Sequence, residues 1–113
     1  MKNFNVLLEA AWIVRDVDSS EDAMAIALSE AGKLLNPKLE FVEVEVGTLS
    51  CAACGDEFMS VFTVANTSLV GLALEMKVYD AESDEHAARI AKLVIGRVFR
   101  DIPLKVVDVT EAE

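Results

Sequence analysis

The sequence contains little positive charge. Of its 113 residues, 10 are Lys or Arg and 20 are Asp or Glu, which gives a formal net charge of -10. Proteins that bind nucleic acids use clustered Lys and Arg side chains to neutralise phosphates, and anionic membrane surfaces attract the same side chains. We therefore expect that the protein binds neither nucleic acid nor an anionic membrane surface.

Long apolar runs are also missing, although 53% of the residues are hydrophobic. The longest apolar stretch, residues 61–74, is interrupted by polar residues from Asn66 to Ser68 and is too short for a helix that spans a bilayer. Residues 1–5 lack the pattern that begins a secretory signal. Together with the length, these features predict a cytoplasmic protein that forms a single domain over residues 1–113.

Cysteine and histidine are scarce, because the chain has two cysteines, Cys51 and Cys54, and one histidine, His86. Two cysteines are too few to build a disulfide-stabilised secreted domain. They form a single Cys-x-x-Cys pair, and in an intracellular protein such a pair more often binds a metal or takes part in redox chemistry. The pair is therefore the strongest chemical signal in the sequence.

The chain contains an internal repeat. When residues 8–35 are compared with residues 72–99, nine of the 28 aligned pairs are identical, against about two expected from ordinary composition. The identical pairs are Leu8/Leu72, Val14/Val78, Asp16/Asp80, Ser19/Ser83, Glu21/Glu85, Ala23/Ala87, Ile26/Ile90, Ala27/Ala91 and Gly32/Gly96. We predict two duplicated halves, residues 1–46 and 69–110, joined by an insertion over residues 47–68.

Hydropathy periodicity gives both halves the same order of elements. Apolar residues alternate along residues 4–14 and 70–78, which is typical of strands with one buried face. Helical spacing of apolar residues follows over residues 24–35 and 87–98. The further strands expected are residues 39–46, residues 104–109 and, within the insertion, residues 58–65.

The ends of the two expected helices carry their own signals. Ser19 and Ser83 stand where N-caps are expected, and acidic residues follow each of them, which suits the positive end of a helix dipole. Pro37 and Pro103 are expected to end the helices.

These elements predict an α+β fold. Two tandem βαβ units with short links usually close into a ferredoxin-like βαββαβ sandwich, in which two helices cover one face of an antiparallel sheet. Here the two duplicated βαβ halves are separated by a β insertion that contains the cysteines. Trp12, on a central strand, is expected to anchor the core, and its truncation to alanine should cost about 3–5 kcal/mol.

The other face of the predicted sheet is too apolar to be freely solvated and too charged to be a core. We expect the insertion strand, a second subunit or a ligand to cover part of it. The residues expected on this open face are Leu7, Glu9, Ala11, Ile13, Phe41, Glu43, Glu45, Leu69, Ala73, Glu75, Lys77 and Tyr79.

Cys51, Cys54 and Gly55 have the spacing of a metal knuckle. Two intervening residues form a tight turn that directs both thiolates at one ion, and a glycine after the second cysteine permits a positive φ. Tetrahedral zinc requires four ligands, so a second chain that shares the ion across a two-fold axis is the simplest completion. We therefore predict a homodimer with a shared zinc. A redox pair and a pair of unliganded or oxidised thiols are the alternatives.

Glu9, Glu75 and Lys77 form a second candidate site for a ligand or an interface on the open face. Neighbouring carboxylates can act as acid and base or hold a divalent cation, whereas Lys77 and Arg15 can also neutralise them. The favoured function is a dimeric metal-knuckle module for binding or assembly. The alternatives are a regulatory domain that binds a small molecule on the open face and an enzyme that uses Glu9 and Glu75.

Seven segments spread along the chain match the pattern of a known family. They are LEAAW at 8–12, SEAGK at 29–33, LNP at 35–37, VEVEVG at 42–47, CAACG at 51–55, LEMKV at 74–78 and HAARIAK at 86–92. Together they resemble an uncharacterised archaeal protein family of unknown function. The cysteine segment also resembles a zinc knuckle, a motif that often has proline where this chain has Ala52. The resemblance implies a cytoplasmic archaeal protein and no particular activity.

Overall fold

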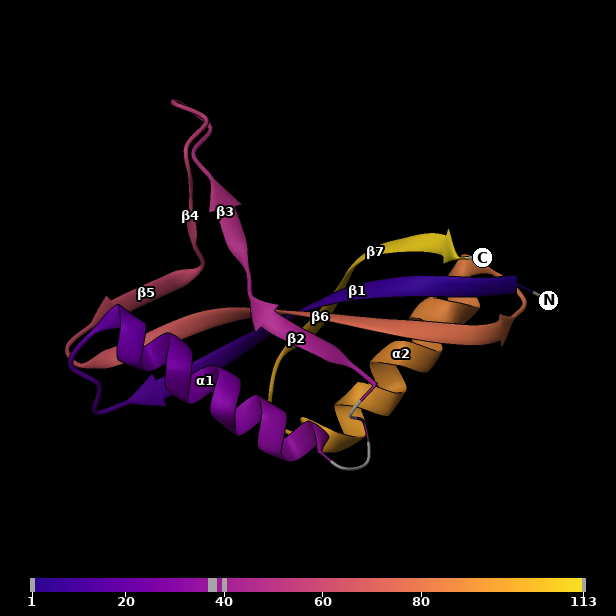
Figure 1. The fold of residues 1–113 in the computed structure, drawn as a ribbon, viewed down its shortest axis with the longest axis horizontal. Helices are drawn as coiled ribbons and strands as arrows, with labels where there is room; N and C mark the ends of the chain where they lie inside the picture. Colours follow the sequence, from indigo (N-terminus) through magenta and orange to yellow (C-terminus); the bar gives the residue numbers. More distant parts are fainter. Residues whose placement is uncertain (1, 37–38, 40, 113) are drawn as a thin grey trace.

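The computed structural model describes residues 2–36, 39 and 41–112. Two long strands, β1 (Lys2–Arg15) and β6 (Thr67–Ala81), lie side by side and antiparallel at the centre of the main sheet (Figure 1). Their register places buried residues opposite one another, as at Trp12 and Val70. Alternate side chains are buried along most of both strands, as the period-two pattern predicted.

Three shorter strands form the edges of this sheet: β2 (Glu43–Val46), β5 (Val61–Val64) and β7 (Leu104–Ala112). All pairings are antiparallel, and the strand order is β2-β6-β1-β7, with β5 also beside β6. β2 pairs with residues 72–75 of β6, and β5 pairs with residues 67–70. β2 and β5 are therefore two pieces of one interrupted edge strand.

Two helices, α1 (Ser20–Leu35) and α2 (Asp84–Val98), lie on the same side of the sheet (Figure 1). The predicted N-caps are confirmed, because the hydroxyl oxygens of Ser19 and Ser83 each accept a hydrogen bond at 3.1 Å from the amide three residues later. Pro37 lies outside the described residues, and α2 ends ahead of Pro103. No helix within the described ranges is long and apolar enough to cross a membrane.

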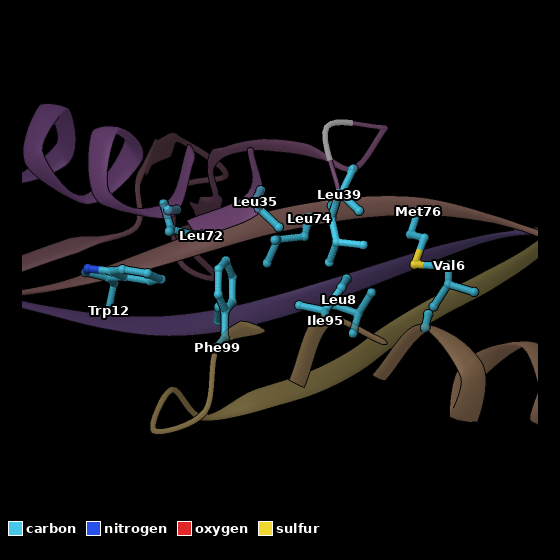
Figure 2. Close-up of a cluster of buried hydrophobic side chains, with 14 of the residues drawn as sticks. Val6, Leu8, Trp12, Leu35, Leu39, Leu72, Leu74, Met76, Ile95 and Phe99 are labelled. Carbon is cyan, nitrogen blue, oxygen red and sulfur yellow. The ribbon is translucent and has the colours of Figure 1, made fainter. Parts of the chain in front are cut away.

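The core lies between the helices and the inner face of the sheet (Figure 2). Trp12 is 5% exposed, and its ring meets the Phe99 ring edge-on, with centroids 5.1 Å apart. The prediction that Trp12 belongs to the core is therefore confirmed. Small side chains let the helices approach the sheet closely; the fully buried alanines of α1 and α2 are Ala23, Ala27, Ala31, Ala87 and Ala91.

Between β2 and β5 the chain leaves the sheet edge as a two-stranded hairpin, which we call the arm (residues 47–60). Its strands are β3 (Thr48–Ser50) and β4 (Glu57–Met59), and they pair only with each other within the described chain. The arm projects from the body on the side away from the helices (Figure 1). An unsupported two-stranded hairpin is marginally stable in water, so the arm depends on its attachment.

Two backbone hydrogen bonds attach the base of the arm to β6, and a third joins the two ends of the arm to each other. The Gly47 amide donates to the Gly71 carbonyl oxygen, the Ser60 amide to the Gly47 oxygen, and the Gly71 amide to the Ser60 oxygen, each at 2.8 Å. Both ends of the arm are therefore held at one point of the central strand.

Two expected strands differ from the observed ones. The strand expected over residues 58–65 is divided between β4 and β5, which belong to different sheets, because the chain changes direction at the base of the arm. The insertion therefore extends the sheet edge through β5 and does not lay a strand across the open face. The strand expected over residues 39–46 is shorter, because Leu39 and Val42 form a turn closed by a 3.0 Å backbone hydrogen bond; residue 40 lies outside the described residues. A mixed α+β fold with an antiparallel sheet and two helices is confirmed.

Candidate functional site

The knuckle lies at the tip of the arm, between β3 and β4. The Cys51 amide donates to the Asp56 carbonyl oxygen, and the Gly55 amide donates to the Cys51 carbonyl oxygen, both at 2.7 Å. Gly55 has a φ of 78°, so the positive φ expected after the second cysteine is present. The resulting tight loop places Cys51 and Cys54 on one turn.

The surroundings of Cys51 favour its thiolate form. A hydrogen bond from the Cys54 side chain has the largest effect in lowering the pKa of the Cys51 thiol. Backbone hydrogen bonds from Cys54, Ala53 and Gly55 lower this pKa further, while desolvation acts in the opposite direction. The thiolate is the form of cysteine that binds metals and that reacts as a nucleophile.

Each chain offers two ligands at this site. Among the described residues, no group of three or more His, Cys, Asp or Glu side chains is placed to hold a metal ion. The single histidine, His86, lies at the start of α2, where its Nδ1 accepts a hydrogen bond from the Glu82 amide at 3.1 Å. Cys51 and Cys54 are free thiols. They supply half of the ligands that a tetrahedral four-cysteine zinc site requires.

The open face predicted from the sequence is the sheet face away from the helices, and its residues are exposed or half-buried. On this face Glu9 of β1 lies opposite Lys105 of β7, whereas Glu75 of β6 lies opposite Glu43 of β2. Lys77 lies opposite Asn5, one pair further along the same face. The two glutamates thus have different cross-strand neighbours, one a cation and one a second carboxylate.

Glu9 and Glu75 are diagonal neighbours on the paired strands β1 and β6, because Glu9 lies opposite Ala73 and Glu75 lies opposite Leu7. Glu75 and Lys77 share a hollow of about 700 Å³ beside Phe41 and Tyr79. Glu9 lines other hollows, around the base of the arm. The two carboxylates considered as a catalytic acid and base thus lie on adjacent strands of the open face and line different hollows.

Apolar side chains gather at the foot of the arm. Phe62, Leu69 and Ile13 form a row across β5, β6 and β1, and they are 52%, 44% and 52% exposed. Leu49 of the arm stands beside Phe62 and Leu69 in the lining of a hollow. Contiguous exposed apolar residues of this kind mark a surface that contacts a partner or a ligand.

Three residues near the site were not anticipated from the sequence: Lys105, Ser60 and Gly71. A Cβ atom at Gly71 would lie 3.0 Å from the Cβ of Ser60, so the two backbones approach closely here. A glycine inside a strand signals such an approach, and this signal was available in the sequence. The position of Lys105 depends on a register shift between Leu7 and Leu8, which no local pattern reveals.

The fold and the knuckle define a small α+β protein that carries a two-cysteine arm on the edge of its sheet. The chain belongs to the family described as a protein of unknown function (DUF555), which matches residues 4–112. This confirms the resemblance to an uncharacterised archaeal family.

Relatives from archaea match over nearly their whole length. The chain is 63% identical to a UPF0212 protein of Methanocella arvoryzae, over 100% of both chains. It is 55% identical to a UPF0212 protein of Halobacterium salinarum, over 98% of this chain and 93% of the relative. It is also 55% identical to a UPF0212 protein of Methanospirillum hungatei, over 98% of this chain and 99% of the relative. No solved structure is significantly similar to the chain.

Proposed function

We propose that the protein is a homodimeric module for binding or assembly in which two knuckles share one zinc ion. The observation that carries this proposal is the place of Cys51 and Cys54 at the tip of a projecting arm. A knuckle that stands clear of the body can meet a second copy without a collision between the two bodies. Two cysteines from each chain complete a tetrahedral site on a two-fold axis.

The chemistry of the tip supports metal binding. The lowered pKa of the Cys51 thiol reduces the competition of protons with a metal ion. Hydrogen bonds from backbone amides to a ligating sulfur also help to orient it.

The arm itself has a surface suited to a second copy. Phe58 lies opposite Leu49 on the ribbon and is 46% exposed. In the proposed dimer the Phe58 side chain packs against the partner arm, which removes apolar surface from water.

For the body we propose a ferredoxin-like βαββαβ sandwich built from two duplicated halves. With β2 and β5 counted as one strand, the order of elements along the chain is βαββαβ, and the first and third strands lie at the centre. Each half also begins with a long strand followed by a serine-capped helix. We further propose a cytoplasmic location, because the cysteines are free and a reducing compartment keeps such thiols reduced.

Metal analysis of the full chain, purified under reducing conditions, tests the proposal. A shared four-cysteine site predicts about 0.5 zinc per chain and a dimer in sedimentation experiments. A structural zinc is held tightly enough to survive purification, so less than about 0.2 zinc or iron per chain would contradict the proposal.

A variant separates the role of the metal from that of the protein surface. Cys51→Ser should lose the zinc and dissociate into monomers, because a serine hydroxyl does not supply the thiolate that the ion requires. Ser50→Ala, at the adjacent position in β3, is the matched control and should keep both zinc and dimer. A Cys51→Ser protein that lacks metal and is still dimeric would show that the ion does not join the two copies.

A further inference from the structure

A hollow lies at the foot of the arm, on the open face of the sheet, with a volume of about 330 Å³. Its floor is formed by Ala11 and Gly71, which lie opposite one another on the two central strands. Leu49 of the arm, the Phe62–Leu69 pair and Pro103 stand around this floor. The hollow exists because two small residues are surrounded by larger apolar ones.

The base of the arm keeps this hollow in place. Ser60 lies against Gly71, and the two residues are joined by a 2.8 Å backbone hydrogen bond. The opposite side is held by a 3.1 Å hydrogen bond from the Ala11 amide to the Pro103 carbonyl oxygen. The floor and both sides are therefore fixed by main-chain contacts, so the hollow is largely preformed, as is usual for small-molecule sites.

Two opposite charges stand at one end of the hollow. Glu9 and Lys105 lie opposite one another on β1 and β7, and both belong to the lining. Within the described residues, the one ion pair with a separation of 4.0 Å or less joins Lys2 and Glu111. The Glu9 carboxylate and the Lys105 ammonium group are thus farther apart than 4.0 Å, which leaves both free to contact a ligand.

We propose that this hollow binds a free α-amino acid with an apolar side chain. The ligand's ammonium group would contact the Glu9 carboxylate, and its carboxylate would contact the Lys105 ammonium group. Its apolar side chain would lie over Ala11 and Gly71. The volume is at the small end of the range of about 300–1,000 Å³ for ligand sites, which suits a molecule of this size.

The proposed ligand follows from the arrangement of charges. A ligand with one charge would leave either Glu9 or Lys105 uncompensated, whereas a zwitterion satisfies both, and charge-assisted hydrogen bonds are the stronger kind. The apolar lining favours an apolar side chain, because contact with the exposed rings and chains of Phe62 and Leu69 removes apolar surface from water. This site is separate from the cysteines at the tip, so it goes beyond the proposed zinc-linked dimer.

Titration of the full chain with L-leucine, followed by amide chemical shifts in NMR, tests this proposal. Saturable shifts should centre on Ala11, Gly71 and Leu104, which line the hollow. 4-Methylpentanoate lacks the ammonium group and isopentylamine lacks the carboxylate, so each should bind about tenfold more weakly or worse. L-Leucine amide, which keeps the ammonium group alone, should be weakened similarly.

Variants of the charged residues test whether leucine binds in this hollow. Glu9→Gln and Lys105→Gln should each weaken leucine binding about tenfold or more, because each removes one charged contact. Glu43→Gln and Lys77→Gln are the matched controls, since these residues share the open face and lie outside this hollow. They should leave the affinity unchanged. All four side chains are exposed, so the variants are expected to fold.

Three results would overturn the proposal. The first is the absence of saturable shifts with leucine, isoleucine, valine and phenylalanine up to about 20 mM, a concentration that reveals even weak ligands. The second is equal binding of leucine and leucine amide, which would indicate recognition of an amine, such as a peptide N-terminus. The third is unchanged affinity in both Glu9→Gln and Lys105→Gln.

Discussion

Replacement of Gly71 by alanine tests how tightly the arm is fastened to the sheet. In a strand, alanine normally stabilises a protein relative to glycine by about 0.5–1 kcal/mol. At this position the added Cβ would lie 3.0 Å from the Cβ of Ser60 and would overlap the Ser60 hydroxyl oxygen. The hydroxyl can rotate away, but the Ser60 Cβ cannot move unless the backbone held by the 2.8 Å hydrogen bond to Gly71 also moves.

We therefore expect Gly71→Ala to lower the free energy of unfolding by about 1–3 kcal/mol, the usual cost of an overpacked site. Urea unfolding monitored by the fluorescence of Trp12, the single tryptophan, measures this change. Gly32→Ala in α1 is the matched control. A Cβ there meets nothing within 4 Å, so the control should raise the free energy of unfolding by about 1 kcal/mol.

A double variant identifies the contact responsible. Ser60→Gly removes both overlapping atoms, so Gly71→Ala introduced into the Ser60→Gly protein should be nearly neutral or stabilising. The difference between the two backgrounds is a coupling energy, which should fall within about 0.5–3 kcal/mol for residues in contact. A Gly71→Ala protein as stable as the parent would refute the reasoning, and so would an equal loss in both backgrounds.

Three further predictions follow from the core, a helix cap and the knuckle. Trp12→Ala should lower the free energy of unfolding in urea by about 3–5 kcal/mol, and a loss below about 1 kcal/mol would contradict the packing against Phe99. Ser83→Ala should cost about 1 kcal/mol in thermal unfolding through loss of the α2 cap, and no shift in the midpoint would count against that role. Cys54→Ala should raise the pKa of the Cys51 thiol, because it removes the largest of the lowering effects. The rate of Cys51 alkylation, measured against pH, should therefore have its midpoint at higher pH in the variant than in the parent, and an unchanged midpoint would rule out this hydrogen bond as the main cause.

Alternation along the two long strands was sufficient to predict the centre of the fold. One face of β1 and β6 is buried against helices, so a shift of one residue would turn every apolar side chain outward. The serine caps were predictable for a similar reason, because they act within three residues of the helix start. Such features depend on local chemistry, which a single sequence contains.

The interrupted edge strand could not be predicted in the same way. β2 and β5 align with each other only because both pair with β6, and the apolar residues of β4 and β5 look like one continuous strand when taken alone. The break at Ser60 depends on hydrogen bonds to residues distant in sequence.

In the candidate sites, too, the features made by neighbouring residues were predictable and those made by distant residues were not. The Cys-x-x-Cys-Gly spacing correctly predicted the turn at Gly55, because that turn is made by neighbouring residues. Its place at the end of an arm was not foreseen, because that place depends on the broken edge. Glu9 was selected for its relation to Glu75, its diagonal neighbour on β6, whereas its direct partner on β7, Lys105, was not anticipated. That pairing is set by the irregular register of β1 and β7.

The two ends of the arm nearly touch, because the Ser60 nitrogen lies 2.8 Å from the Gly47 oxygen. The sheet therefore has to bridge the same short gap whatever the length of the hairpin between these residues. Excision of the arm and closure with a short linker should leave an uninterrupted edge strand, and a foreign hairpin grafted at the same junction should be displayed in its place. The hairpin between Gly47 and Ser60 can thus be replaced by another peptide without a change to the rest of the fold.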